Sequence, residues 1–270
     1  MHEFGNAELA ELAQLRGCTN PRLTNRIAVV TGASRGLGKF FAETLAWEGA
    51  HVILTARSAN VRDVADGINR SGGTANCVEM DVERDDSVLH AFDQIATQWG
   101  CPSIVINNAG ITEMVGTLDQ EPSNFESILA TNLRGPWMVA REAARHMISN
   151  KIPGSIVNIA SILALRQAGR VTAYAVTKAG LVQLTKQLAL EWARYGIRVN
   201  ALAPGYVETD FNREFFTTGK GQEMIRRIPM RRLTRLEELA EPLMLLAGDG
   251  GAAMTGVVLP VDGGHLLSSL

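Results

Sequence analysis

Short runs rich in β-branched residues alternate with longer helical patterns from residue 26 onward, and no other feature constrains the fold as strongly. Several runs are apolar throughout, which is typical of parallel strands covered on both faces. Repeated βα units of this size predict a doubly wound α/β fold, with a seven-stranded parallel sheet and helices on both faces. The expected strands cover 27–31, 51–56, 75–81, 103–107, 155–161, 197–203 and 257–262, and the expected helices 36–48, 61–71, 84–99, 123–149, 173–195 and 235–247.

Residues 1–24 lie outside this rhythm, so we expect an N-terminal appendage followed by a single domain over 25–270. The first residues lack the basic and apolar regions of a signal peptide, and no window has the roughly 18 to 20 apolar residues of a transmembrane helix. The net charge of −2 argues against nucleic acid or a membrane surface as a partner. The three cysteines and five histidines are scattered, which predicts no metal site and a reducing, cytoplasmic location.

The stretch TGASRGLG, residues 31–38, follows the first expected strand and opens a helix. In a doubly wound fold, ligands bind beyond the carboxyl ends of the strands. Gly32 would allow a tight turn, Gly36 would let backbone amides approach a phosphate, and Gly38 would bring the helix close to the strand. The spacing G-x-x-x-G-x-G differs from the commoner G-x-G-x-x-G pattern, and a plain tight turn is the alternative. We interpret the stretch as a dinucleotide-binding turn.

The end of the second strand, LTARS, indicates which dinucleotide would bind. An NAD-binding protein usually has an acidic residue there for the adenosine ribose, but Ala56 occupies the expected position and Arg57 follows it. Arg35 lies inside the glycine turn. Two guanidinium groups suit a 2′-phosphate, so we predict NADP in preference to NAD. The alternative is that Arg57 is merely solvated.

The pentapeptide YAVTK places Tyr174 and Lys178 four residues apart, on one face of an expected helix. A phenol titrates near pH 10, which is too high for efficient proton transfer at neutral pH. An ammonium group ~5 Å away, at an effective dielectric constant of ~20, would lower the phenol pKa by about two units. This spacing arises often by chance, so the pair alone favours coincidence over catalysis.

Two polar residues elsewhere in the sequence make catalysis the favoured interpretation of the Tyr174–Lys178 pair. Ser161 ends the expected strand SIVNIAS, where its hydroxyl could bond a substrate oxygen as charge develops on it. A structural serine that caps a loop is the alternative. Asn132 begins the helix expected over 131–149, and it could simply be an N-cap.

Together these motifs resemble one family. The pattern resembles the short-chain dehydrogenase/reductase superfamily, in its single-domain branch, over about residues 24–264. The resemblance implies a Rossmann-type fold and an NAD(P)-dependent enzyme that acts on CH–OH groups. The matching motifs, in order, are TGASRGLG, NNAG (107–110), Asn132, Ser161, YAVTK, PG (204–205) and VDGG (261–264).

The resemblance also implies a role for each matching residue. Tyr174 would be the general acid in carbonyl reduction and the base in alcohol oxidation. Lys178 would lower the pKa of that tyrosine and bind the nicotinamide ribose, Ser161 would polarise the carbonyl, and Asn132 would hold a water that links the lysine to solvent. The implied cofactor-binding residues, besides Tyr174 and Lys178, are Gly32, Ser34, Arg35, Gly36, Leu37, Gly38, Arg57, Ser58, Asp81, Val82, Asn108, Ala109, Gly110, Pro204, Gly205, Val207 and Thr209.

The segment 205–230 is too long for a simple turn and is expected to be a lid over the substrate. An apolar pocket would suit a medium-sized ketone, although the same aromatic residues could merely anchor the lid. Basic residues in the lid (Arg213, Lys220, Arg226, Arg227) would instead admit an acidic substrate. The expected pocket residues are Ile162, Leu163, Tyr206, Phe211 and Phe215, with Phe216 and Met224 in the cover.

The leading hypothesis is an NADPH-dependent reductase of a ketone or aldehyde. Within the enzyme class, an NAD-dependent dehydrogenase of a sugar acid or hydroxysteroid, or a 3-ketoacyl reductase, is the alternative. Reductases in this family that act on carrier-bound acyl groups use a basic pair, and Ile152 occupies one of its two positions, with Arg194 at the other. The competing class is a non-catalytic dinucleotide-binding protein. The resemblance also implies a homotetramer, formed through the helices at 131–149 and 173–195 and the C-terminal segment.

Overall fold

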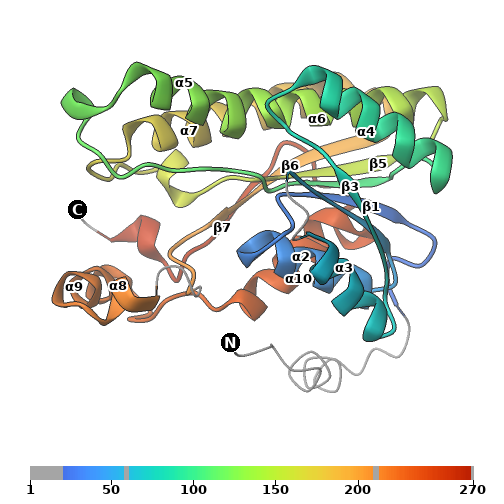
Figure 1. The fold of residues 1–270 in the computed structure, drawn as a ribbon. Coiled ribbons are helices and arrows are strands. Elements are labelled where there is room, and N and C mark those ends of the chain that lie inside the picture. Colours follow the sequence, from blue (N-terminus) through green and yellow to red (C-terminus); the bar gives the residue numbers. More distant parts are fainter. Residues whose placement is uncertain (1–20, 58–60, 209–212, 269–270) are drawn as a thin grey trace.

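Seven parallel strands form one sheet in the order β3-β2-β1-β4-β5-β6-β7, which confirms the predicted Rossmann-type fold (Figure 1). The computed structural model describes residues 21–57, 61–208 and 213–268. The order reverses between β1 and β4, so the connections that follow these two strands diverge at their carboxyl ends. The strands are β1 (Ile27–Thr31), β2 (His51–Ala56), β3 (Thr74–Glu79), β4 (Ile104–Asn107), β5 (Gly154–Ile159), β6 (Ile197–Pro204) and β7 (Val258–Val261).

Helices cover both faces of the sheet (Figure 1). Successive side chains of a strand point to opposite faces, so Val30 of β1 joins one core and Val29 joins the other. The sheet is therefore a rigid support whose carboxyl ends hold the loops. One face carries α2 (Gly36–Trp47), α3 (Val61–Arg70) and α10 (Ala240–Ala247), and the other α4 (Asp85–Gln98), α6 (Gly135–Ser149) and α7 (Thr172–Trp192).

The helix expected over 123–149 is a continuous helical run with an irregular middle. Helix α5 (Pro122–Leu129) leads into a π-helical turn (Ala130–Arg134), and α6 follows at once. The prediction that Asn132 begins a helix is wrong, because this residue lies inside the π turn. A single π turn inside a helix is rare and often marks a functional site.

Strand β5 ends at Ile159, so Ser161 follows the strand by two residues instead of ending it. The serine caps a short 3-10 helix (Ile162–Ala164), and its Oγ accepts the N–H of Leu163 at 3.1 Å. The hydroxyl keeps its own proton available for donation, because this contact uses only a lone pair.

The expected lid contains two short helices, α8 (Arg213–Thr217) and α9 (Gly219–Arg227), near the C-terminal end of the described chain (Figure 1). Of the expected appendage, residues 1–20 lie outside the described ranges, while 21–24 pack on the domain. Leu23 is 1% exposed, and its N–H donates to the carbonyl of Glu48 at 2.7 Å.

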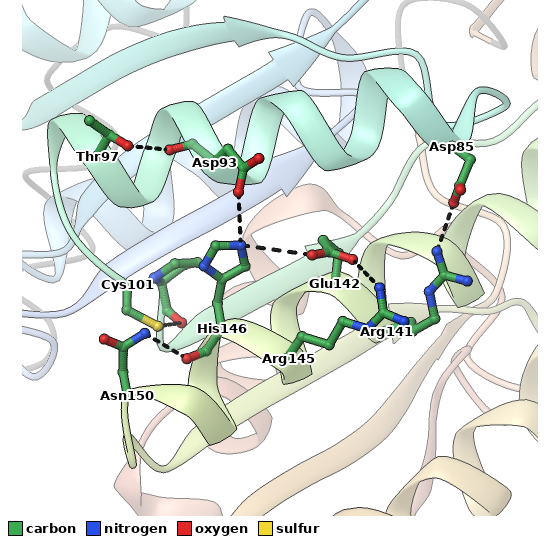
Figure 2. Close-up of polar contacts among 10 residues, drawn as sticks. Asp85, Asp93, Thr97, Cys101, Arg141, Glu142, Arg145, His146 and Asn150 are labelled. Atoms are coloured by element: carbon green, nitrogen blue, oxygen red, sulfur yellow. Dashed lines mark hydrogen bonds and ion pairs between the residues drawn. The ribbon is translucent and has the colours of Figure 1, made fainter.

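Figure 2 shows a group of charged residues that joins α4 and α6. Arg141 on α6 donates to Asp85 on α4 at 2.8 Å. His146 Nε2 lies 3.7 Å from Asp93 and 3.8 Å from Glu142, which in turn pairs with Arg145 at 3.2 Å. Every charge in this group faces an opposite or titratable partner, so we assign it to helix packing.

None of the helices among the described residues is long and apolar enough to cross a membrane. Those residues also contain no group of three or more His, Cys, Asp or Glu side chains placed to hold a metal ion.

Candidate active site

The glycine turn packs tightly against the loop after β4 but is open at its tip. Gly32 and Gly36 have φ values of +64° and +55°, which favour glycine. A Cβ added to Gly38 would overlap the carbonyl oxygen of Gly32 and lie 2.5 Å from Asn108 Nδ2, whereas one at Gly36 would meet nothing within 4 Å. The open tip stands at the amino end of α2, where unpaired amides favour an anion. The residues present therefore fit the pyrophosphate of a dinucleotide.

The NNAG loop is fastened to that turn. Asn108 Nδ2 donates to the carbonyls of Thr31 and Gly32 at 2.9 and 3.1 Å. The backbone N–H groups of Asn108 and Ala109 donate to Thr31 Oγ1 at 3.0 and 2.9 Å. The sequence analysis did not predict this role of Thr31. The available signal was a hydroxyl side chain directly before the first glycine of the turn.

Arg57 stands at the carboxyl end of β2 with an accessible guanidinium group. Its side chain is 60% exposed, and Nη1 lies 3.4 Å from Glu83 Oε1. Arg35 is also exposed, at the start of α2. Asp81 shapes the neighbouring turn, since its Oδ1 accepts the N–H of Glu83 at 3.0 Å. Two arginines are thus exposed near the carboxyl ends of β1 and β2, where the adenosine ribose is expected (the ribose corner), and Glu83 is a residue that the sequence did not single out.

The side-chain amide of Asn132 forms a pair of hydrogen bonds with the backbone of the loop after β4. Its Oδ1 accepts the N–H of Ile111 at 2.8 Å, and its Nδ2 donates to the carbonyl of the same residue at 2.8 Å. Nδ2 also reaches Thr177 Oγ1 on α7 at 3.3 Å. The side chain is fully buried, so the π turn, the NNAG loop and α7 are locked together around it.

Lys178 is the buried cation of the site, with only 4% of the residue exposed. Its Nζ donates to the carbonyl of Ile159 at 2.7 Å and lies 5.5 Å from the centre of the Tyr174 ring. A Cβ added to Gly110 would lie 3.7 Å from Nζ and 3.3 Å from Asn132 Oδ1, so the three residues converge. Burial lowers the pKa of Lys178 to about 8.

The expected depression of the Tyr174 pKa is not found in the protein chain. Burial raises the pKa of this phenol, and an interaction with the Ser161 hydroxyl only partly opposes that effect. The pKa of the phenol rises instead of falling because burial removes the water that would stabilise the phenolate. The interaction with Ser161 does place the tyrosine and the serine side by side, as the sequence predicted.

The loops after β6 and β7 meet on the far side of the site. The N–H of Gly205 donates to the carbonyl of Val261 at 2.9 Å, and a Cβ on Gly205 would lie 2.8 Å from the Cα of Asp262. Val207 is buried and forms a β-bridge with Thr234. The PG and VDGG motifs are therefore in contact, although the sequence separates them by more than fifty residues.

The expected substrate residues fall into two groups. Ile162 is only 2% exposed, while Leu163 is partly exposed beside Ser161. The Tyr206 ring lies 5.9 Å from that of Phe216 and 5.3 Å from that of His265, and Phe215 packs against Phe216 at 5.2 Å. Some of these aromatic contacts anchor the lid, yet Phe215 remains 37% exposed. Three expected residues lie outside the described ranges, namely Ser58, Thr209 and Phe211.

The class of protein defined by this fold and site is a dinucleotide-binding α/β oxidoreductase. A family model described as enoyl-(acyl carrier protein) reductase matches residues 32–265. The chain is 37% identical to a 3-oxoacyl-(acyl-carrier-protein) reductase of Pseudomonas aeruginosa, over 91% of this chain and 99% of that protein. It is 36% identical to 3beta-hydroxysteroid dehydrogenase 1 of Eggerthella lenta, over 91% of this chain and 95% of that protein.

A solved structure of a dehydrogenase is also similar to this chain. The gluconate 5-dehydrogenase of Burkholderia cenocepacia, in complex with NADP and tartrate, superposes with a TM-score of 0.88 at 33% identity, covering 92% of this chain and 98% of that one. The chain therefore belongs to the short-chain dehydrogenase/reductase superfamily. It is an NAD(P)-dependent oxidoreductase that acts on CH–OH groups.

Proposed function

We propose that the chain is an NADPH-dependent carbonyl reductase that converts a ketone or an aldehyde into an alcohol. The observation that supports this best is the grouping of Ser161, Tyr174 and Lys178 around one end of β5 and α7. When bound, the nicotinamide supplies the hydride. The chain itself must then orient the carbonyl, donate one proton and stabilise negative charge on the substrate oxygen.

Tyr174 is the proposed proton donor. Because burial raises its pKa, the phenol keeps its proton at neutral pH, which is the form that reduction requires. Ser161 would donate a hydrogen bond to the carbonyl oxygen, and Lys178 would bind the nicotinamide ribose and stabilise the phenolate left behind. Asn132 is proposed to hold a water near the lysine. In alcohol oxidation the same phenolate would act as the base.

Arg57 and Arg35 support the choice of NADP. Both are exposed near the ends of the first two strands, and Ala56 leaves no carboxylate at the usual ribose position. The remaining cofactor contacts are proposed as the sequence predicted them, from the glycine turn through the NNAG loop to the loop after β6.

The proposed substrate is a medium-sized, largely apolar ketone. Leu163, Tyr206 and Phe215 remain partly exposed at the expected pocket and would pack against it. Ile152 stands where carrier-protein reductases of this family have a basic residue, which argues against a carrier-bound acyl group. Sugar acids and hydroxysteroids are the named substrates of relatives and belong in the test.

The test is a substrate panel followed by NADPH and NADH absorbance, with ketones, aldehydes, hydroxysteroids, sugar acids and 3-ketoacyl thioesters. We expect turnover of at least one apolar ketone with NADPH, and a lower dissociation constant for NADPH than for NADH. Tenfold tighter binding of NADH would overturn the cofactor assignment. Tight cofactor binding without any turnover would favour a non-catalytic binding protein.

We also infer a homotetramer in the cytoplasm. Apolar side chains stand exposed on α6 and α7, among them Trp137, Ile148, Val176 and Leu190, and such surfaces commonly mark interfaces. Light scattering on the purified protein tests the assembly, with a monomer as the contradicting result. The cytoplasmic location stays a prediction from the composition.

A further inference from the structure

The arginine proposed for the 2′-phosphate faces a carboxylate. Arg57 Nη1 lies 3.4 Å from Glu83 Oε1, and the two side chains come from the ends of neighbouring strands. Arg57 is 60% exposed in its side chain, whereas that of Glu83 is only 25% exposed. The arginine is therefore the mobile partner and the carboxylate the fixed one, because exposed long side chains keep their rotamer freedom.

Glu83 is held from its other side by the π turn. Thr131 Oγ1 lies 2.6 Å from Glu83 Oε1, the same oxygen that faces Arg57, and Thr131 is 4% exposed. The Glu83 backbone N–H is fixed by Asp81 at 3.0 Å. These two contacts favour the present position of the Glu83 carboxylate when a second anion approaches.

We propose that Glu83 is a specificity-determining residue, whose anchored carboxylate competes with the cofactor 2′-phosphate for Arg57 and so limits the preference for NADP(H) over NAD(H). This inference rests on the proposed role of Arg57. The reason is the sign of the charges, since Arg57 attracts a phosphate while Glu83, on the same guanidinium, repels it. A ribose that carries a 2′-hydroxyl brings no added charge and is insensitive to this repulsion.

The variant Glu83→Gln separates charge from structure. Glutamine keeps an oxygen that Thr131 can donate to and nearly the same shape, but it removes the negative charge. The probes are adenosine 2′,5′-bisphosphate and adenosine 5′-monophosphate, because these report the ribose corner without the nicotinamide and without turnover. Dissociation constants are measured by titration calorimetry on the full chain, with thermal unfolding as a check of folding.

The expected result is about fivefold to tenfold tighter binding of the bisphosphate by Glu83→Gln, with monophosphate binding within about twofold of wild type. The gain shrinks as salt is raised, because the Arg57 side chain is largely exposed to solvent ions. Glu191→Gln, with the same charge change at the distant end of α7, is the matched control and leaves both constants within about twofold. Equal changes for both nucleotides, or no change in the bisphosphate constant, would overturn the role of Glu83.

The variant Arg57→Ala distinguishes this failure from failure of the proposed NADP site. If Arg57→Ala weakens only the bisphosphate while Glu83→Gln changes nothing, the NADP site stands and the competition by Glu83 is refuted. If Arg57→Ala leaves the bisphosphate constant unchanged, the assignment of Arg57 itself is refuted, and the Glu83 proposal falls with it. The double variant completes the cycle, and we expect it to lose the gain seen in Glu83→Gln alone.

Discussion

Buried or half-buried basic residues stand at both ends of the sheet, but they have different neighbours. At the amino ends of the strands, Arg198 donates to the carbonyls of Leu246, Ala247, Gly248 and Met254, and Ser155 Oγ donates to Leu246 as well. At the carboxyl ends, Lys178 and Asn132 also bind backbone carbonyls. There, however, the anchored groups surround Tyr174 and Ser161, which face each other at the expected substrate position.

The amino end shows that a pocket lined by charges need not be a reaction site. A pocket of about 350 Å³ lies there, lined in part by Arg26, Arg198 and Asp249. Arg26 already pairs with Asp249 at 3.0 Å, and Arg198 closes the carboxyl end of α10. Its arginines are engaged by the protein, so we assign this end to stability and the opposite end to chemistry.

Arg198→Met should give the largest loss of stability without a loss of chemistry. The substitution removes the guanidinium group that donates to four carbonyls around the end of α10, although Leu246 keeps Ser155 and Met254 keeps Asn200 as donors, and this loss costs about 3 kcal/mol of unfolding free energy. Chemical denaturation measures this, and turnover per folded molecule should stay within about twofold. Arg84→Met, which removes an exposed pair with Asp86, is the control and should leave the denaturation midpoint unchanged. A turnover loss in folded Arg198→Met would break the comparison.

Gly38→Ala should act mainly on cofactor binding. The new Cβ would overlap the Gly32 carbonyl oxygen, so the turn must shift, and we expect the NADPH dissociation constant to rise at least about 30-fold. Fluorescence titration measures it. In α3, Gly67→Ala meets only the flexible end of Arg70 at 3.9 Å and should leave cofactor binding unchanged while stabilising the helix slightly. Unchanged binding in Gly38→Ala would refute the phosphate assignment.

Lys178→Met should reveal the cost of burying the cation. The folded chain releases the lysine proton near pH 8, whereas the unfolded chain keeps it until near 10.5. Between these values the unfolded state binds more protons, so wild-type stability should rise relative to the variant, by roughly 1 kcal/mol from pH 7 to pH 9. Urea denaturation across that range tests it. Parallel pH profiles for the two proteins would show that the lysine is not shifted as described.

The sequence predicted the sheet, because local apolar patterns predict strands, and it predicted that Ser161, Tyr174 and Lys178 lie together, because their motifs occur at the ends of strands and on the helix that follows. Ser161 comes just after β5, and Tyr174 and Lys178 lie on α7, which the fold places next to the end of that strand. The π turn around Asn132 could not be predicted, because the spacing of apolar residues does not distinguish the backbone hydrogen bonds of a π turn from those of an α-helix. The raised pKa of Tyr174 was also missed, because burial of both partners is a property of the whole fold.

The other features that the sequence did not predict depend on contacts between residues far apart in the chain. Glu83 lies 26 residues from Arg57 and 48 from Thr131, so no short sequence motif indicates that the three side chains are in contact. The packing of Leu23 on the domain likewise joins residues far apart in the sequence, since its side chain is buried and its N–H donates to the carbonyl of Glu48.

The most direct measurement is turnover of Tyr174→Phe with the best substrate of the panel, beside a titration of NADPH binding. Phenylalanine keeps the ring but removes the proton that the site is proposed to donate, so kcat should fall at least about 100-fold while the NADPH dissociation constant stays within about threefold. Tyr195→Phe, in the exposed 3-10 turn (Ala193–Tyr195) that directly follows α7, should leave both values unchanged. Near-normal turnover of a folded Tyr174→Phe protein would contradict the account, because proton transfer would then come from elsewhere.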